Sequence, residues 1–220
     1  HIGRSIELNP DNPVAYRSMG DALRSARQHA MAIRSYEKAC ALNPEHLDAM
    51  LNLGNLFHEL DMFERAEACF TRIITKAPKH RQALNNLGKV NQDMGRLNQA
   101  LTFYDRCLEC HPLHADAHFN RATLLLSMGD YNQGWEAYEW RFKRPGAATV
   151  YPHRFSTPRW HGENLKDKCL LVHCEQGMGD VLQFMRYLPM VKTLVGEVVL
   201  EVHEPLVPLV QLQPYVNGVI

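Results

Sequence analysis

Hydrophobic and polar positions along the chain follow two different periods. From residue 13 to about residue 148, apolar and small side chains recur at helical spacing, and this pattern itself repeats about every 34 residues. Four prolines mark the repeat: Pro10, Pro44, Pro78 and Pro112. A repeat of this length is typical of stacked helix–turn–helix units, because one unit alone cannot bury its apolar face. This part of the chain is therefore predicted to be an α-helical solenoid.

Each predicted unit places the same residue types at the same points. The unit at 81–114 has Leu87 and Gly88 in its first helix, and Ala100 and Tyr104 in its second. Small residues suit places where two helices cross closely, and the aromatic ring fills the space between units. The coincidence of several such positions at one period makes the helical prediction specific.

The turns and limits of the units follow from the same alignment. Gly95 and Gly129 close first helices, where a left-handed glycine can stop a helix. Complete units are expected at 13–46, 47–80, 81–114 and 115–148, after a remnant of an earlier unit at residues 1 to about 12. Because the chain begins inside a unit, we expect its amino-terminal end to be a fragment boundary.

The fourth unit departs from the pattern. Arg121 stands where earlier units have leucine, and Gly134 replaces an alanine. Its second helix is crowded by four aromatic residues, Trp135, Tyr138, Trp140 and Phe142. A terminal repeat is expected to be atypical, so these side chains could simply cap the solenoid. We favour the alternative that they dock a different domain, because a solvent-exposed cap needs no such cluster.

The hydrophobic pattern changes after residue 168. Five proline and glycine residues between 143 and 168 interrupt any helix and predict a linker. Cys169–His173 is a short apolar run that predicts a buried strand. A loop at 175–180 follows, and then a helix at 181–194 whose apolar side is expected to carry Leu182, Met185, Leu188 and Val191.

The last part of the chain completes a βαβ pattern. Strands are expected at 197–203 and 216–220, with a short helix at 205–212 between them. Such a unit is parallel and right-handed by default. The expected organisation is a solenoid at 1–144, a linker at 145–167 and a partial Rossmann-like segment at 168–220. A doubly wound domain usually needs more than twice these ~54 residues, so a fragment boundary is expected at this end also.

Composition excludes several classes of function. Lys plus Arg and Asp plus Glu are 24 each, so the net charge is +0 and no nucleic-acid partner is expected. No apolar run reaches the roughly 18 residues of a membrane span, and we expect a cytoplasmic protein. The six cysteines are expected to be reduced, and mostly buried in the repeat helices.

Two apparent ligand motifs around residue 110 are rejected. Cys107–His111 has the C-x-x-C-H spacing of covalent haem attachment, but Cys107 occupies a position that packs between helices in the other units. Cys110, His111, His114 and His118 could suggest zinc. His114, however, shares one repeat position with His46 and His80, so we expect no metal.

The repeat positions resemble the tetratricopeptide repeat (TPR) family. The second unit supplies its pattern with Met50, Leu53, Gly54, Phe57, Ala66, Phe70 and Pro78. The resemblance implies a superhelix whose first helices line a concave groove. Asn52, Asn86 and Asn120 share one position on that face, where evenly spaced amides could hydrogen-bond an extended peptide or protein ligand. The alternative is that these amides hydrogen-bond one repeat to the next.

A second resemblance covers residues 138–220. The E-Q-G-x-G-D-x-x-Q-F run within LLVHCEQGMGDVLQFMRYLP is similar to the start of a GT-B glycosyltransferase of the bacterial heptosyltransferase family, as found in TPR fusions. The resemblance implies a substrate-binding loop of Glu175, Gln176, Gly177, Met178 and Gly179, with Asp180 as the catalytic base that deprotonates an acceptor hydroxyl. The alternative is a tight strand-to-helix turn with an acidic residue in the first helical turn.

The leading hypothesis is a piece of a bacterial TPR–glycosyltransferase whose repeats recruit an acceptor or partner protein. The fragment itself is expected to be inactive and without a cofactor, because the domain that binds the nucleotide-sugar donor is missing. The alternative is a TPR interaction module with no enzymatic role. A third possibility is that the α/β segment associates between chains as a homo-oligomer, covering an exposed edge strand.

Overall fold

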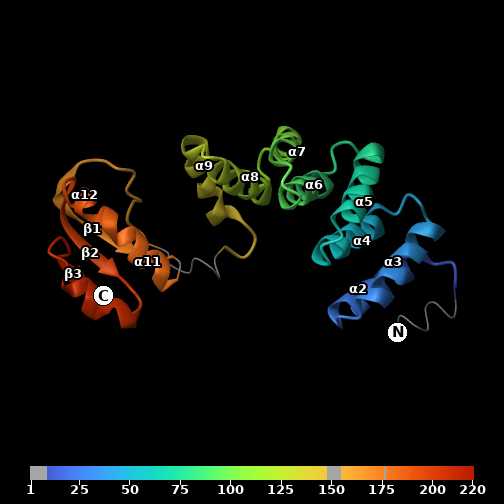
Figure 1. The fold of residues 1–220 in the computed structure, drawn as a ribbon, viewed down its shortest axis with the longest axis horizontal. Helices are drawn as coiled ribbons and strands as arrows, with labels where there is room; N and C mark the ends of the chain where they lie inside the picture. The colour runs from blue at the N-terminus through green and yellow to red at the C-terminus, as the bar shows by residue number, and fades with distance from the viewer. Residues whose placement is uncertain (1–8, 148–154, 176) are drawn as a thin grey trace. The chain divides into compact units, whose positions relative to one another are not determined.

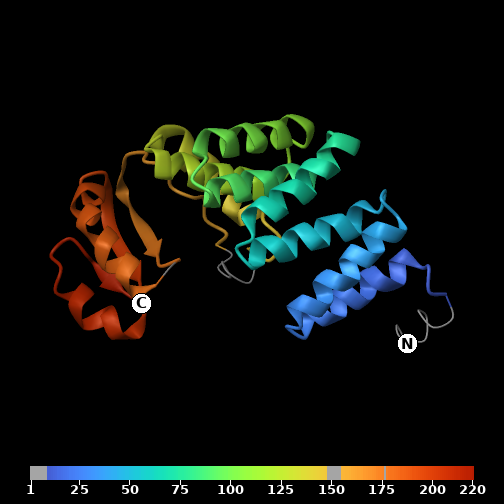
Figure 2. The same cartoon turned by 45° about the vertical axis from the view of Figure 1, so that its right-hand side comes forward.

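The chain forms two compact units, His1–Ala147 and Ala148–Ile220, in a computed structural model that describes residues 9–147, 155–175 and 177–220. Figures 1 and 2 show that the first unit is built from paired helices and the second from a sheet with helices. The predicted remnant of an earlier repeat lies mostly at residues 1–8, outside the described residues. No helix in the described part of the chain has both the length and the apolar composition to cross a membrane.

The helical unit consists of four successive helix pairs. The pairs are α2 (Pro13–Ser25) with α3 (His29–Leu42), α4 (Leu47–Glu59) with α5 (Phe63–Lys76), α6 (Arg81–Asp93) with α7 (Leu97–Cys110), and α8 (Ala115–Met128) with α9 (Tyr131–Tyr138). A 3₁₀ helix, η1 (Glu139–Lys143), follows the last pair. The first helices begin at the first residues of the predicted units, which confirms the period and the solenoid.

Three of the four first helices have a side-chain cap at their amino-terminal end. Asn12, His46, His80 and His114 hold the same repeat position immediately before these helices. The Nδ1 atoms of His80 and His114 each accept a hydrogen bond of 3.2 Å from a backbone N–H three residues later. This bond satisfies one of the amides that have no partner inside the helix. Capping therefore explains His80 and His114, whereas the side chain of His46 makes no capping hydrogen bond.

The turn inside each helix pair contains one residue in the left-handed region. Gly95 and Gly129 have φ angles of +74° and +88°, which confirms their predicted role. The two earlier turns place Arg27 (φ +58°) and Asp61 (φ +56°) at the same repeat position. A side chain in this region is strained, so the turn is built with a favourable residue only in the last two units.

A glycine in the first helix makes room for an aromatic ring from the second. Tyr36, Phe70 and Tyr104 are at most 1% exposed, and their rings pack against Gly20, Gly54 and Gly88. A Cβ added at Gly88 would lie only 2.3 Å from the ring of Tyr104. The predicted close crossing of the two helices is thus confirmed.

The fourth unit differs because its small residues are exchanged. Ala122 holds the position of Gly88, while Gly134 holds the position of Ala100. The extra Cβ of Ala122 closes the space that the ring would enter, and Tyr138 is only half-buried. The Tyr138 ring instead lies 5.3 Å from Phe119 and 5.6 Å from Trp135.

The chain after α9 folds back onto α8. The Trp140 ring stacks on His118 at 3.8 Å with an interplanar angle of 10°. The guanidinium of Arg144 lies 4.3 Å from the centre of the Phe119 ring and pairs with Asp116. These contacts account for part of the aromatic cluster within its own unit. Trp135 is 53% exposed, and its docking to another domain stays a prediction.

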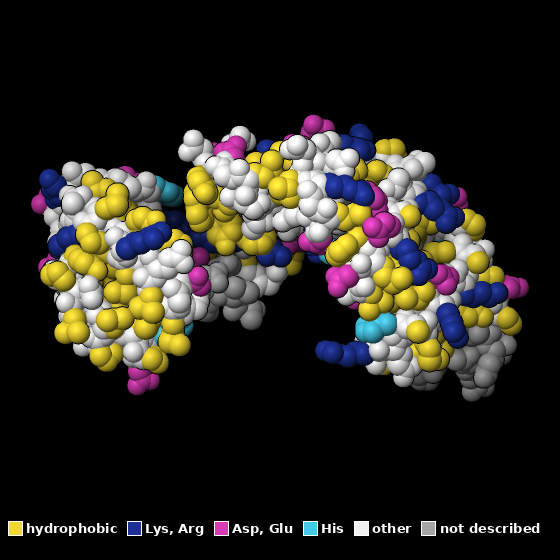
Figure 3. All heavy atoms as spheres, in the orientation of Figure 1, with side chains coloured by type: hydrophobic (Ala, Val, Ile, Leu, Met, Phe, Trp, Pro, Cys, Tyr) yellow, Lys and Arg dark blue, Asp and Glu magenta, His cyan; other side chains and the backbone are white. Residues whose placement is uncertain are grey.

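Ion pairs join successive second helices on the surface of the solenoid. Arg65 pairs with Glu37 at 3.0 Å, and Arg96 pairs with Glu67 at the same distance. Figure 3 shows basic and acidic side chains lying next to one another on one face of the helical unit. Exposed pairs of this kind contribute little stability each, because water and salt screen them.

The second unit is a small parallel sheet with helices. Its strands are β1 (Leu165–His173), β2 (Val195–Glu201) and β3 (Gly218–Val219), paired in the order β1-β2-β3. Between β1 and β2 lie α11 (Met178–Phe184), η2 (Met185–Tyr187) and α12 (Leu188–Lys192), and between β2 and β3 lie η3 (Glu204–Leu206) and α13 (Val207–Gln211). Both strand pairs are parallel, as predicted.

Two predictions for this unit were wrong in detail. β1 is not buried on both faces, because Leu170 and Val172 pack in the core while Leu171 between them is 37% exposed. The strand also begins at Leu165 rather than at Cys169. Residue pattern alone did not show that one face of this sheet lacks a cover within the described residues.

The predicted single helix at 181–194 is divided. Pro189 lies in the first turn of α12, where a backbone N–H would have no partner inside the helix. The same proline prevents α11, η2 and α12 from forming one continuous helix. Met185 and Leu188 are buried as expected. Leu182 is 47% exposed, and Val181 takes its place against the core.

Candidate functional site

The predicted asparagine row links successive first helices. The Nδ2 groups of Asn52, Asn86 and Asn120 donate hydrogen bonds of 2.8, 2.7 and 3.0 Å to side chains of the preceding helix pair. Asn52 and Asn86 donate to Asp21 and Asn55, which share one repeat position. These contacts are the repeat-to-repeat bonds that the sequence left as the alternative to peptide binding.

The third bond of the row changes its acceptor. The corresponding position on α6 is Lys89, whose ammonium group has no acceptor atom. Asn120 therefore donates to Asn85, which in turn donates to Asn86 at 3.4 Å. Each side-chain amide of the row uses one N–H in these bonds and has a second N–H that could donate to a ligand. The peptide-binding role of the row therefore stays a prediction.

An open groove of about 870 Å³ lies along the first helices of the last three pairs. It is lined by residues of α4, α6 and α8, by the end of α7 and the turn before α8, and by residues 143–145 at the end of η1 and just after it. Asn86 and Asn120 belong to its lining, together with Asn55 and Lys89, but Asn52 does not. The structure thus brings two of the three predicted asparagines into one groove.

The groove is strongly basic. Arg81, Lys89, Lys143 and Arg144 line it, whereas Asp116 is the one carboxylate among the described lining residues. Asp116 is paired with Arg144, with 2.8 Å between Oδ1 and Nε. Arg81, Lys89 and Lys143 make no ion pair with any residue in the described ranges. Three uncompensated positive charges therefore face this cavity.

The sequence interpretation missed this basic character. One residue per repeat on this face, Asn55, Lys89 and Thr123, shows no consistent charge. Arg81 comes from a different turn of α6, and Lys143 and Arg144 come after the last helix pair, at a point with no counterpart in the groove from the earlier units. The adjacent Lys143 and Arg144 were visible as a signal, but their approach to the groove depends on the packing of Trp140 and Phe119.

The imidazole of His114 lines the same groove. Burial is the main cause that lowers its pKa, and the nearby positive charges of Arg81 and His111 act in the same direction, against Asp116. The neutral form is the one that caps α8, because Nδ1 must accept the backbone N–H of Ala117. The site therefore prefers an uncharged histidine at neutral pH.

The cysteine and histidine side chains of the two rejected motifs do not come together as one cluster of ligands. Cys107 is fully buried, and burial raises the pKa of its thiol to about 11. In the described part of the chain no three His, Cys, Asp or Glu side chains group as metal ligands.

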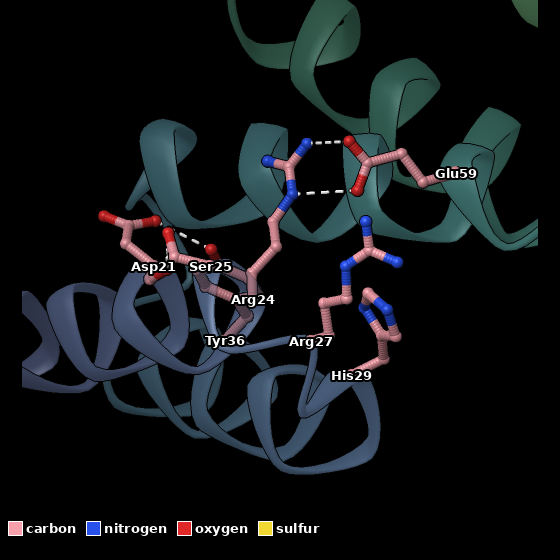
Figure 4. A pocket seen from close by; sticks show the side chains of 7 residues that line it. All are labelled: Asp21, Arg24, Ser25, Arg27, His29, Tyr36 and Glu59. Carbon is pink, nitrogen blue, oxygen red and sulfur yellow. Dashed lines mark hydrogen bonds and ion pairs between the residues drawn. The ribbon is translucent and has the colours of Figure 1, made fainter.

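A second cavity of about 630 Å³ lies at the first two helix pairs (Figure 4). Arg24 forms a two-bond ion pair with Glu59, and this hydrogen bonding is the main cause that lowers the pKa of the Glu59 carboxyl. The Tyr36 hydroxyl donates to Asp21 at 2.7 Å. Two of the charges in this cavity, Arg24 and Glu59, neutralise each other, and Asp21 pairs with Arg17 outside its lining, so this cavity lacks the excess of positive charge found in the basic groove.

The glycine loop lies at the carboxyl end of β1, where it was predicted. Gly177 caps α11 with φ −68°, an ordinary conformation, so no left-handed turn requires this glycine. A Cβ at Gly179 would meet no atom within 4 Å. Asp180 is exposed in the first turn of α11, and its backbone N–H donates to the Gly177 carbonyl at 3.0 Å. Gln176 lies outside the described residues; Glu175 precedes it, and Met178 is the exposed first residue of α11.

Sequence comparison gives a family for the helical unit. Models described as tetratricopeptide repeat match residues 23–89, 82–110 and 103–136. Protein FlbA of Caulobacter vibrioides is 42% identical over 65 residues, which is 29% of this chain and only 10% of FlbA. The chain therefore spans a small part of this relative.

Solved structures with the same arrangement of helices share little sequence. PilF of Pseudomonas aeruginosa superposes with a TM-score of 0.60 at 18% identity, covering 68% of this chain and 69% of PilF. The first TPR of Spaghetti (RPAP3), solved with the HSP90 peptide SRMEEVD, gives 0.51 at 18% identity and covers 54% and 94%. At this identity the likeness establishes the fold alone.

Proposed function

Because residues 23–136 are tetratricopeptide repeats, we propose that the helical unit binds an extended segment of a partner protein in the groove along α4, α6 and α8. The observation that carries this proposal is the cavity of about 870 Å³ that contains the side chains of Asn86 and Asn120. A row of amides can pair with the backbone of an extended peptide without reading its side chains. The RPAP3 domain of the same fold, solved with a bound peptide, supports a peptide-binding role for helical units of this kind.

The asparagine row supplies a matched test of the proposal. Asn52, Asn86 and Asn120 each make one bond between repeats, so substitution by alanine has a similar structural cost in each case. Only Asn86 and Asn120 line the groove. Peptides selected on the wild-type chain from a displayed library should bind Asn86→Ala and Asn120→Ala at least about tenfold more weakly, while Asn52→Ala retains affinity.

The outcome of this test separates binding from folding. If all three variants lose affinity in parallel with their melting temperature, the row serves only the stacking of repeats. If Asn86→Ala and Asn120→Ala bind like the wild type, the groove is not the peptide site.

A second proposal concerns the α/β unit. We propose that it belongs to a bacterial glycosyltransferase of the GT-B type, for which the repeats recruit the acceptor protein. The parallel order of the sheet, the loop at the carboxyl end of β1 and the exposed carboxylate of Asp180 support this proposal. Asp180 would act as the base that accepts a proton from the acceptor hydroxyl, and the donor would be a nucleotide-sugar bound by the full-length protein.

This proposal is tested on the full-length native protein. Asp180→Asn should abolish transfer from a nucleotide-sugar to a bound acceptor, and it should leave capture of groove-binding peptides unchanged. Unchanged transfer would remove Asp180 from the mechanism. A full-length protein that consumes no nucleotide-sugar would leave the alternative, an interaction module without enzymatic role.

Self-association through the α/β unit is the third arrangement that we propose to test. β1 pairs only with β2 among the described strands, so its other edge carries backbone groups that a second chain could pair with. Light scattering coupled to gel filtration should then report a dimer, and a monomer at all concentrations would dismiss it.

A further inference from the structure

We infer that the groove along α4, α6 and α8 selects an acidic peptide segment, and that Asp116 limits this selection by occupying Arg144. This inference rests on the proposed peptide-binding function and names the chemistry of the partner. The amide row recognises a backbone of any sequence. The basic residues around it recognise carboxylates, so the two contributions can be separated by experiment.

The first argument is the charge of the lining. Four basic side chains from two different parts of the unit face the groove, namely Arg81 and Lys89 on α6, and Lys143 and Arg144 at the end of η1. Their one acidic neighbour in the described lining, Asp116, neutralises Arg144 alone. The chain as a whole has a net charge of +0, so this excess is local and does not reflect a basic protein.

The second argument is that the basic segment is held in place before a ligand arrives. The ammonium of Lys143 lies 4.0 Å from the centre of the Trp140 ring, and Trp140 stacks on His118 of α8. Arg144 is fixed between Asp116 and the Phe119 ring. Side chains that are ordered in the free protein lose less entropy on binding, which raises affinity for a complementary ligand.

The third argument distinguishes a peptide from a nucleic acid, the other polyanion that such a site could take. No Phe, Tyr or Trp belongs to the described lining of the groove, so unpaired bases would find no surface on which to stack. The amides of Asn86 and Asn120 suit the alternating N–H and C=O groups of a peptide instead. The observations therefore favour an acidic peptide.

Asp116 has a distinct role in this arrangement. Its carboxylate already pairs with the guanidinium of Arg144, with 2.8 Å between Oδ1 and Nε. The other N–H groups of Arg144 can still donate to a ligand carboxylate, but the negative charge of Asp116 offsets the charge of Arg144 and repels that carboxylate. Replacing Asp116 by asparagine keeps the size of the side chain and removes the competing charge, so affinity should increase.

The test measures fluorescence anisotropy with three labelled peptides that alternate serine with Glu, Gln or Lys. The Glu peptide should bind the intact chain about tenfold or more tightly than the Gln peptide, and added salt should weaken only the former. Lys89→Gln and Lys143→Gln should each weaken the Glu peptide about threefold to tenfold, whereas Lys38→Gln on α3, outside the groove, should not. Asp116→Asn should strengthen the Glu peptide and leave the Gln peptide unchanged.

Each outcome decides between the two proposals. If Glu and Gln peptides bind equally, the groove binds peptides without charge selection, and this inference alone is overturned. If none of the three peptides, nor any peptide from the displayed library, binds, the proposed function fails and this inference fails with it. An RNA oligonucleotide that displaces the Glu peptide at lower concentration than unlabelled Glu peptide would also overturn the choice of partner. Circular dichroism of each variant confirms that the helices are retained.

Discussion

The left-handed turn at Asp61 offers a test of the helical unit that is independent of any ligand. This residue and Gly95 hold the same repeat position, with φ angles of +56° and +74°. A Cβ at Gly95 would meet no atom within 4 Å, so the position tolerates a side chain sterically and only the backbone conformation is strained. Asp61→Gly should therefore stabilise the second helix pair, and Gly95→Asp should destabilise the third.

The magnitude follows from two opposing contributions. An L-residue in the left-handed region costs roughly 1–2 kcal/mol, somewhat less for Asp than for most residues. Replacement by glycine removes this strain but also lowers the free energy of the unfolded chain by about 0.5–1 kcal/mol, because glycine makes that chain more flexible. The net gain expected for Asp61→Gly is about 0.5–1 kcal/mol. In a domain of this size, that corresponds to an increase of about 1–4 °C in melting temperature.

The assay is thermal and urea denaturation of both variants, followed by far-ultraviolet circular dichroism. A rise for Asp61→Gly with a similar fall for Gly95→Asp confirms that the turns share one strained conformation. Two changes of the same sign would refute the reasoning, because the same backbone conformation cannot favour glycine in one repeat and aspartate in the next.

Three further predictions concern packing, protonation and thiol reactivity. Gly88→Ala should destabilise the chain by about 1–3 kcal/mol in urea titration, because the new methyl group would overlap the buried ring of Tyr104. Neutral His114 should contribute its full stability above its ordinary pKa of 6.5, and this contribution should be lost as pH falls through the lowered pKa of the folded state. His114→Asn retains a side chain that can cap the helix but does not titrate. The melting temperature of this variant should therefore depend less on pH between about pH 7.5 and 5 than that of the wild type. Exposed Cys169 should react with a maleimide in the native protein, whereas buried Cys107, with its pKa raised to about 11, should react only after unfolding; equal rates would contradict the packing.

The repeat structure could be predicted closely because its signals are local and recur. The helices begin, end and cross at points marked by Pro78, Gly88, Ala100 and Pro112. Similar residues recur at the same positions in the other units, so each unit supports the helix boundaries predicted for the others. The α/β unit has no such redundancy. There the apolar run at 169–173 indicated a strand, but the exposed side of Leu171 depends on which elements cover the sheet.

The groove shows a different limit of sequence reasoning. Asn86 and Asn120 were found because they recur at one repeat position, yet their hydrogen-bond partners depend on the acceptors of the preceding unit. The basic charge was missed because Lys143 and Arg144 reach the groove only through the rings of Trp140 and Phe119. A residue that acts outside its own repeat leaves no periodic signal.

The exchange of glycine and alanine in the fourth unit has a consequence for how the solenoid opens. Since Ala122 keeps the Tyr138 ring from the buried position that Tyr104 occupies, α9 should have the smallest free energy of local opening among the paired helices of the helical unit and exchange its amide hydrogens first. The segment that carries Lys143 and Arg144 follows α9 directly; its contacts with α8 order it in the closed state, and it should open only together with α9. A ligand held by these two side chains would stabilise the closed state and slow hydrogen exchange in α9. The exchange rate of this helix would therefore report whether the groove is occupied.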